Sequence, residues 1–157
     1  MSREESKIKF VNLHGHSVAG SIFDGLGYPQ EHMDFAYSNG CDALALTDHG
    51  NMNGLAGQVL HAKKMRAEGK DFKPIFGCEA YFIPSMEEWH AEYEKAKEDK
   101  KRAKAIAKEK ASGATVEDEG ASKATQDILR RRRHLVLLAQ NQKGLNNLFK
   151  LVSESYK

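Results

Sequence analysis

The sequence predicts an α/β protein with parallel strands, on three observations. Four short apolar runs have the length of buried strands, and the stretches between them carry helical spacing or helix-capping residues. Strand and helix therefore alternate along the 157 residues, as parallel strands with crossover helices require. Histidines and carboxylates lie at or near the ends of several strands, where α/β proteins gather their chemistry.

The first strand is predicted at residues 8–13, a short and mostly apolar run that ends in a pair of histidines. His14 and His16 are two residues apart, and the period of two in a strand places both imidazoles on one face. Two neutral imidazoles there can bind one divalent cation. A hydrogen-bonded pair of histidines without a metal is the alternative that this motif alone leaves open.

The next elements follow from turn and capping residues. In order, we expect a helix opened by Pro29 and closed by Asn39-Gly40, a strand at 41–46, a helix from Asn51 or Asn53 to about Glu68, a strand at 74–82, a strand at 135–139 and a helix capped by Asn141. In each helix the apolar side chains recur at helical spacing, so each helix has a face for the core.

One stretch departs from this alternation. Ser85 and Glu88 form a capping-box pattern, and a long helix rich in Glu, Lys and Ala is expected from there to about residue 111. A second, short basic helix is expected at 123–133. We interpret residues 86–132 as a surface insertion that forms a helical hairpin.

Composition narrows the class of protein. A net charge of +2 gives no reason to infer nucleic-acid binding from charge alone. No apolar run has the length of a membrane span, and the charged N-terminus is unlike a secretory signal. Cys41 and Cys78 lie far apart in apolar contexts, which favours buried, reduced thiols. We expect a cytoplasmic protein that does not bind membranes.

Polar residues at the strand ends predict a metal site. His14 and His16 end the first strand, Asp48 and His49 end the second, and Glu79 lies toward the end of the third. The carboxyl ends of parallel strands meet at one rim, so these side chains are expected to converge. Mixed His and carboxylate ligands suit zinc, manganese or iron, and paired ions activate water against phosphate esters. The residues alone therefore predict a metal-dependent hydrolase.

A set of motifs then resembles a known family. They are His14-Gly-His16-Ser, Phe23-Asp24-Gly25, Ala45-Leu-Thr-Asp48-His49-Gly50-Asn51-Met52, Lys73-Pro-Ile-Phe-Gly-Cys-Glu79-Ala-Tyr and His134-Leu-Val-Leu-Leu-Ala139-Gln-Asn. Together they resemble the opening of the PHP (polymerase and histidinol phosphatase) domain of C-family replicative DNA polymerases, the polymerase III alpha type of bacteria and phages. The resemblance covers almost the whole chain except residues 86–132.

The resemblance implies a PHP-type (β/α)7 barrel, of which residues 1–157 would be the first half: a single partial domain carrying the helical-hairpin insertion. It implies up to three divalent ions, zinc or manganese, and six positions match family ligands: His14, His16, Asp24, His49, Glu79 and His134. For Asp24, which looks like a turn residue, a role in the turn alone is the alternative. His14, His16, His49 and Glu79 would act in catalysis through the bound metal. Asp48 is expected to orient or charge an adjacent imidazole rather than bind metal.

The resemblance also implies a role in DNA replication. We expect the N-terminal PHP segment of a DNA polymerase III alpha-type nucleotidyltransferase, with a phosphoesterase site of the 3′–5′ exonuclease or pyrophosphatase kind that is incomplete in this segment. The alternatives are a catalytically silent scaffold and a small-molecule phosphatase. The expected partners are the rest of the barrel and polymerase on the same or a separate chain, DNA bound through the full polymerase, and other replisome subunits. No nucleotidyl-transfer carboxylates are recognisable, so polymerisation is expected to belong to chain beyond Lys157.

Overall fold

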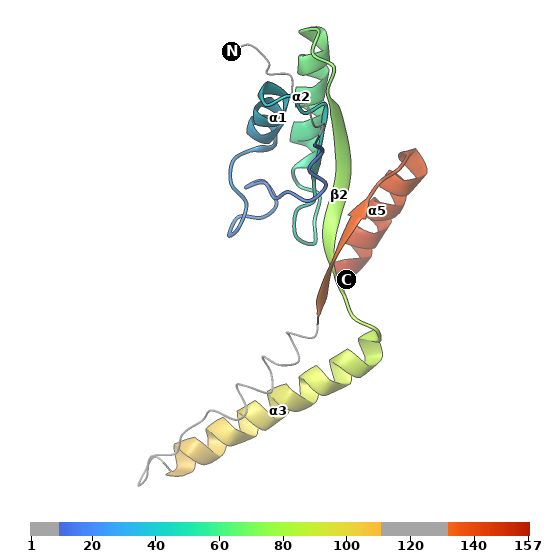
Figure 1. The fold of residues 1–157 in the computed structure, drawn as a ribbon. Coiled ribbons are helices and arrows are strands. Elements are labelled where there is room, and N and C mark those ends of the chain that lie inside the picture. The colour runs from blue at the N-terminus through green and yellow to red at the C-terminus, as the bar shows by residue number, and fades with distance from the viewer. Residues whose placement is uncertain (1–9, 111–131) are drawn as a thin grey trace. The chain divides into compact units, whose positions relative to one another are not determined.

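The computed structural model describes residues 10–110 and 132–157, and it is a mixed α/β fold (Figure 1). In chain order the elements are α1 (Pro29–Ser38), β1 (Ala43–Leu46), α2 (Leu55–Ala67), β2 (Lys73–Phe82), α3 (Met86–Lys110), β3 (Arg133–Leu138) and α5 (Gln142–Ser155). The chain divides into two units: residues 1–80 with 135–157, and residues 81–134. No helix in the described ranges has both the length and the apolar character needed to cross a membrane.

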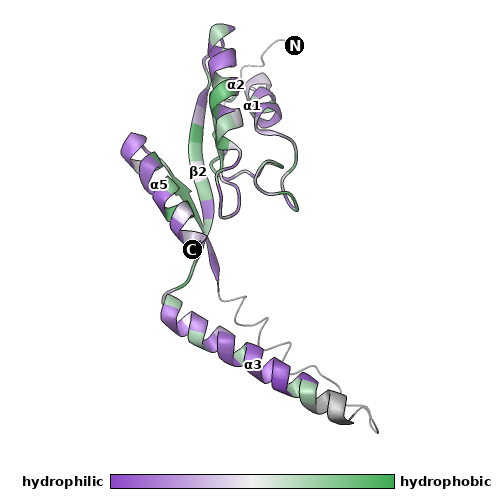
Figure 2. Ribbon diagram, turned by 180° about the vertical axis from the view of Figure 1, so that it is seen from behind, coloured by the Kyte–Doolittle hydropathy of each residue, from purple (hydrophilic) through white to green (hydrophobic). Residues whose placement is uncertain are grey.

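The core of the first unit lies between α1, α2 and β1. Its buried side chains are Met33, Ala36, Leu44, Leu46, Ala62, Met65 and Phe72. Figure 2 shows hydrophobic colouring on parts of α2, which belongs to this core, and of the neighbouring strand β2. The predicted helix ends at Asn39-Gly40 and at about Glu68 are confirmed. Gly40 and Gly69, which follow these ends, adopt the positive φ that ends a helix at low steric cost. The N-cap of α2 is Gly54, so the expected asparagine cap is wrong.

β1 and β2 pair in parallel, as predicted, and the pairing continues past the end of β1. Leu46 lies opposite Phe76, and an isolated parallel bridge joins His49 to Glu79 at the same offset of 30 residues. The N–H of Glu79 donates to the carbonyl of Asp48 at 3.1 Å, and the N–H of Gly50 donates to the carbonyl of Glu79 at 2.8 Å. Backbone pairing therefore holds His49 and Glu79 side by side.

β3 does not follow the parallel pattern. The sheet order is β1-β2-β3, and the N–H of Ala139 donates to the carbonyl of Phe76 at 2.8 Å. A Cβ on Gly77, one residue further along β2, would meet Leu137 and Leu138, which lie earlier in β3. β3 therefore runs antiparallel to β2. The expectation of parallel strands throughout is therefore wrong for β3. A parallel neighbour requires a connection that carries the chain back to the other end of the sheet, whereas an antiparallel neighbour does not.

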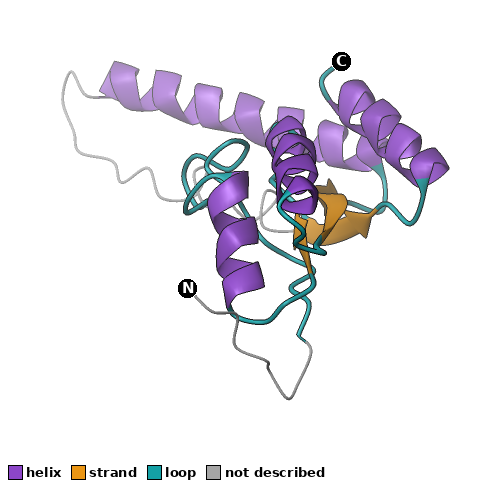
Figure 3. Ribbon diagram, turned by 90° about the horizontal axis from the view of Figure 1, so that it is seen from above, coloured by secondary structure: helices purple, strands orange, loops and turns teal. Residues whose placement is uncertain are grey.

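Residues 10–28 form no regular element, and Figure 3 draws them as loop. The carbonyls of Asn12 and Gly15 accept from the N–H groups of Ala45 and Thr47 at 2.8 and 2.7 Å. Three residues on one side thus match two on the other, as in a β-bulge. The predicted buried strand is wrong: the segment runs along the outer edge of β1, and Phe10 and Leu13 are exposed.

The second unit contains α3, which is hydrophilic along most of its length (Figure 2). At its start the N–H of Glu88 donates to Ser85 Oγ at 3.2 Å, which is one half of the predicted capping box. The rings of Trp89 and Tyr93 stack with their centroids 5.1 Å apart. The second helix expected at 123–133 lies largely outside the described residues, so the helical hairpin stays a prediction.

Candidate metal centre

Glu79 is the buried anchor of a histidine and carboxylate cluster in the first unit. The central residues of β2, Gly77 to Glu79, are buried, and Glu79 is only 1% exposed. A carboxylate at such a position costs free energy unless charges or hydrogen bonds compensate it. Imidazoles supply that compensation here.

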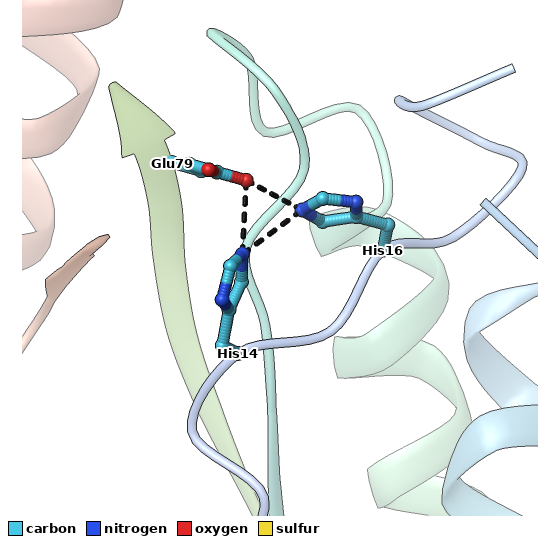
Figure 4. A group of neighbouring side chains, drawn as sticks. All are labelled: His14, His16 and Glu79. Carbon is cyan, nitrogen blue, oxygen red and sulfur yellow. Dashed lines mark hydrogen bonds and ion pairs between the residues drawn. The ribbon is translucent and has the colours of Figure 1, made fainter. Parts of the chain in front are cut away.

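Two histidines of the bulged segment point at Glu79 (Figure 4). His14 Nε2 lies 2.9 Å and His16 Nε2 lies 2.6 Å from Glu79 Oε2, and the two nitrogens are 3.1 Å apart. The predicted meeting of His14 and His16 is confirmed, although the bulge rather than a regular strand brings them together. The side chain of His14 is half exposed, so this group has one open side.

A second group shares His16 with the first. Asp24 Oδ2 lies 2.6 Å from His49 Nε2 and 3.3 Å from His16 Nδ1, and His49 Nδ1 lies 3.3 Å from Glu79 Oε2. His16 and His49 therefore each contact Asp24 through one ring nitrogen and Glu79 through the other. The position of strand ends in the sequence did not predict Asp24 as a ligand, because Asp24 follows a turn. Only the resemblance to the family motif predicted it.

The donor set fits a divalent cation. Three imidazole nitrogens lie within 3.3 Å of Glu79 Oε2, whereas one carboxylate oxygen offers about two lone pairs. Two ligands held at about 2.0–2.2 Å from one ion are themselves about 3.0–3.4 Å apart, which matches the two histidine nitrogens at 3.1 Å. The triads His14, His16, Glu79 and His16, Asp24, His49 each converge within 4.8 Å. Nitrogen and oxygen donors together suit zinc or manganese.

Asp48 is buried but contacts no imidazole among the described residues. Its Oδ1 accepts from the N–H of Ser17 at 2.6 Å and from Ser21 Oγ at 3.1 Å, and its Oδ2 accepts from Ser17 Oγ at 3.0 Å. It therefore supports the loop that joins His16 to Asp24, instead of orienting a ring directly as the sequence led us to expect.

His134 belongs to the second unit, at the start of β3. Its ring packs edge-on against Tyr81 with the centroids 4.9 Å apart. Because β3 is antiparallel to β2, the start of β3 pairs with the end of β2. This explains why the candidate ligand His134 lies at the start of its strand instead of at the end. Its role as a ligand stays a prediction.

Cys78 lies next to Glu79 and is also buried. Burial raises the pKa of the Cys78 thiol, and the carboxylates of Asp48 and Glu79 raise it further against the opposing backbone hydrogen bond from Gly50. Both cysteines are free, as predicted, with Cys41 half-buried.

Three polar residues of the site were not selected from the sequence. Ser17 and Ser21 bind Asp48, and Asn51 Nδ2 donates to the carbonyls of Gly20 and His49 at 2.9 and 2.8 Å. The available signal was the spacing of two serines four residues apart, with glycines around them, directly after the His-x-His motif. Such a pattern also describes an ordinary polar turn, so it does not single out a site.

Comparison with known proteins agrees with the geometry. The PHP domain model matches residues 12–157, so the chain belongs to the PHP domain family. The resemblance predicted from the motifs is therefore confirmed.

Several of the similar curated proteins are DNA polymerase III alpha subunits. The chain is 34% identical over 152 residues to that of Treponema pallidum, covering 96% of the chain and 10% of the relative. It is 33% identical to that of Thermus aquaticus, with 96% and 9% covered, and 32% identical to that of Aquifex aeolicus, with 94% and 10% covered. The chain thus spans about a tenth of the length of these relatives.

One solved structure shows a partial likeness to this chain. A protein of Bifidobacterium adolescentis described as a metal-dependent phosphoesterase aligns with a TM-score of 0.41 and 19% identity, over 51% of this chain and 25% of the other.

Proposed function

We propose that this chain carries a metal-dependent phosphoesterase centre and serves as the PHP segment of a replicative polymerase of the DNA polymerase III alpha type. One observation carries the proposal: three imidazole nitrogens surround a single oxygen of the buried Glu79 carboxylate. One carboxylate oxygen has about two lone pairs for hydrogen bonds, so hydrogen bonding alone does not explain three nitrogens around it. A cation bound by these nitrogens and the oxygen together does explain the arrangement.

The residues have separable tasks in this proposal. Glu79 supplies buried negative charge, and His16 and His49 connect it to Asp24. His14 and Asp24 are about half exposed, so a phosphate ester can approach from their side. A bound cation would supply the positive charge that polarises a phosphoryl oxygen and favours attack by water.

The polymerase context supports a substrate that arises during DNA synthesis. Several relatives of this chain are DNA polymerase III alpha subunits. Phosphodiesters at a primer 3′ end, cleaved by 3′–5′ exonuclease action, or pyrophosphate are therefore the proposed substrates. The ligand set is His14, His16, Asp24, His49 and Glu79, with His134 added from the family motif.

The test compares His14→Ala with His61→Ala. His61 is a histidine of the same unit that pairs with Asp34 at 2.8 Å, away from the cluster, so it is the matched control. Both variants and the unchanged sequence, each within the complete polymerase subunit, are incubated with Mn²⁺ or Zn²⁺ and three substrates: bis(p-nitrophenyl) phosphate, single-stranded DNA labelled at its 5′ end, and pyrophosphate. Metal content is measured in parallel.

Hydrolysis that requires metal, falls at least tenfold in His14→Ala and persists in His61→Ala would support the proposal. Bound metal without hydrolysis of any substrate would contradict it and leave the scaffold role, in which ions only stabilise the fold. Hydrolysis that resists chelation and the His14 change would mean that another site is responsible.

A further inference from the structure

A buried carboxylate outside the candidate ligand set organises the loop that carries part of it. Asp48 is 3% exposed and receives three hydrogen bonds from the loop, two from Ser17 and one from Ser21. A carboxylate accepts such bonds without needing a proton, and bonds to a charged acceptor are stronger than neutral ones. Asp48 therefore fixes the loop immediately after His16.

Ser21 extends this connection to His49. Its hydroxyl donates to Asp48 Oδ1 at 3.1 Å and accepts from the N–H of His49 at 3.1 Å. Ser21 also ties the loop internally, because its carbonyl accepts from the N–H groups of Asp24 and Gly25 at 3.2 and 2.5 Å. One serine thus contacts the backbone of two candidate ligands that are 25 residues apart.

Two glycines show how closely the loop is packed. A Cβ on Gly20 would collide with Asn51 Oδ1 and lie 2.6 Å from Cβ of Asp48. A Cβ on Gly25 would collide with the backbone carbonyl group of Ser17, which has no flexible side chain to move aside. The loop therefore has little freedom to adopt another path while Asp48 remains in place.

From these contacts we infer that Asp48 and Ser21 are positioning residues. They pre-organise the metal centre by holding His16, Asp24 and His49 at fixed positions relative to one another. This inference rests on the proposed function and deepens it, since it concerns residues that bind no metal themselves. Outer hydrogen-bond partners of metal ligands typically change metal affinity about 10–100-fold when removed.

The experiment measures cobalt binding by the whole chain through its visible absorption, with dissociation constants from competition against a chromophoric chelator. Ser21→Ala removes the link between Asp48 and His49 but leaves both Ser17 contacts. Asp48→Asn keeps the size of the side chain and removes one of its two acceptor oxygens. Ser38→Ala is the matched control, because Ser38 Oγ donates only to the carbonyl of Phe35 at the end of α1.

We expect the dissociation constant to rise about 10–100-fold in Ser21→Ala and Asp48→Asn and to stay unchanged in Ser38→Ala. We also expect the absorption bands of both site variants to shift at saturating cobalt. A change that only weakened the fold would lower affinity but return the original spectrum once the metal is saturating, and that result would overturn the inference.

Equal affinities and identical spectra would likewise overturn the inference while leaving the proposed function intact. Failure of the unchanged chain to bind cobalt would overturn both. If circular dichroism shows that Asp48→Asn does not fold, Ser21→Ala decides the question, because it leaves the buried carboxylate with its two Ser17 contacts.

Discussion

Glu79 and Cys78 are adjacent buried residues whose environments act in opposite ways. The Glu79 carboxylate lies within 3.3 Å of three imidazole nitrogens, which offer it polar partners. Cys78 faces the interior, and the nearby carboxylates of Asp48 and Glu79 oppose its ionisation. The thiol is therefore held in its protonated, unreactive form, because only the thiolate is a good nucleophile.

We expect Cys78 to be alkylated by iodoacetamide much more slowly than the half-buried Cys41 at pH 8, as measured by mass spectrometry of time points. In urea both cysteines should react at similar rates, which is the control. Because the folded pKa is raised, the thiol's contribution to stability is present below its unfolded pKa of about 8.5 and declines as the pH rises through the folded value. Faster labelling of Cys78 in the native chain would contradict this account.

The positions of single candidate ligands could be predicted from the sequence where the ligand lies at or near the end of a strand. His49 and Glu79 follow from the parallel register of β1 and β2, and the structure brings them together. Asp24 was not predictable in this way, because its position depends on hydrogen bonds within a loop rather than on a repeating backbone geometry. Hydroxyl groups such as Ser21 leave no periodic signal at all.

β2 is the element on which the site is built, and Gly77 lets its neighbours approach it closely. A Cβ at Gly77 would lie 2.6 Å from the carbonyl oxygen of Leu137 and 2.8 Å from Cγ2 of Thr47. Both distances are too short for carbon contacts, and a strand carbonyl cannot move without loss of pairing. The absence of a side chain is therefore required where β2 meets β3.

Gly77→Ala should lower the free energy of unfolding by about 1–3 kcal/mol, as overpacking of a core does. Gly144→Ala is the control: it lies inside α5, where an added Cβ makes only contacts of 3.5 Å or more. Alanine is favoured over glycine in a helix by about 0.5–1 kcal/mol, so this change should stabilise the chain. Urea denaturation measures both, and equal effects would show that the contacts around Gly77 are relaxed in solution.

At the level of elements, helices were predicted better than the sheet. The limits of α1 and the start of α5 follow from local signals, namely proline, glycine and the Asn141 side chain that accepts from the N–H of Gly144. The direction of β3 has no local signal, because an apolar run reads alike in either direction.

For the whole molecule, the candidate ligands connect segments that are distant in sequence. His14 and Glu79 contact each other across 65 residues, with Asp24 and His49 between them in the chain. An ion bound to this set would bind only the folded chain, since the unfolded chain does not hold these residues together. Metal binding and folding are therefore expected to be coupled.

Zinc or manganese at 100 times its dissociation constant should raise the free energy of unfolding by about 2.7 kcal/mol, measured by thermal or urea denaturation. A chelator should reverse the gain. Glu79→Gln should abolish it, whereas Glu154→Gln should retain it, because Glu154 is an exposed residue of α5 that pairs with Lys157. The same gain in both variants would mean that the ion binds elsewhere.

The two shared imidazoles limit how the cluster can be filled. A neutral imidazole has one nitrogen with a free lone pair and one that carries hydrogen, yet His16 and His49 each direct one nitrogen to Asp24 and the other to Glu79. A ring that gives its lone pair to an ion on one side must turn its proton to the other. An ion bound beside Glu79 therefore decides which tautomer of His16 and His49 faces Asp24. A second ion should consequently bind with a different affinity from the first.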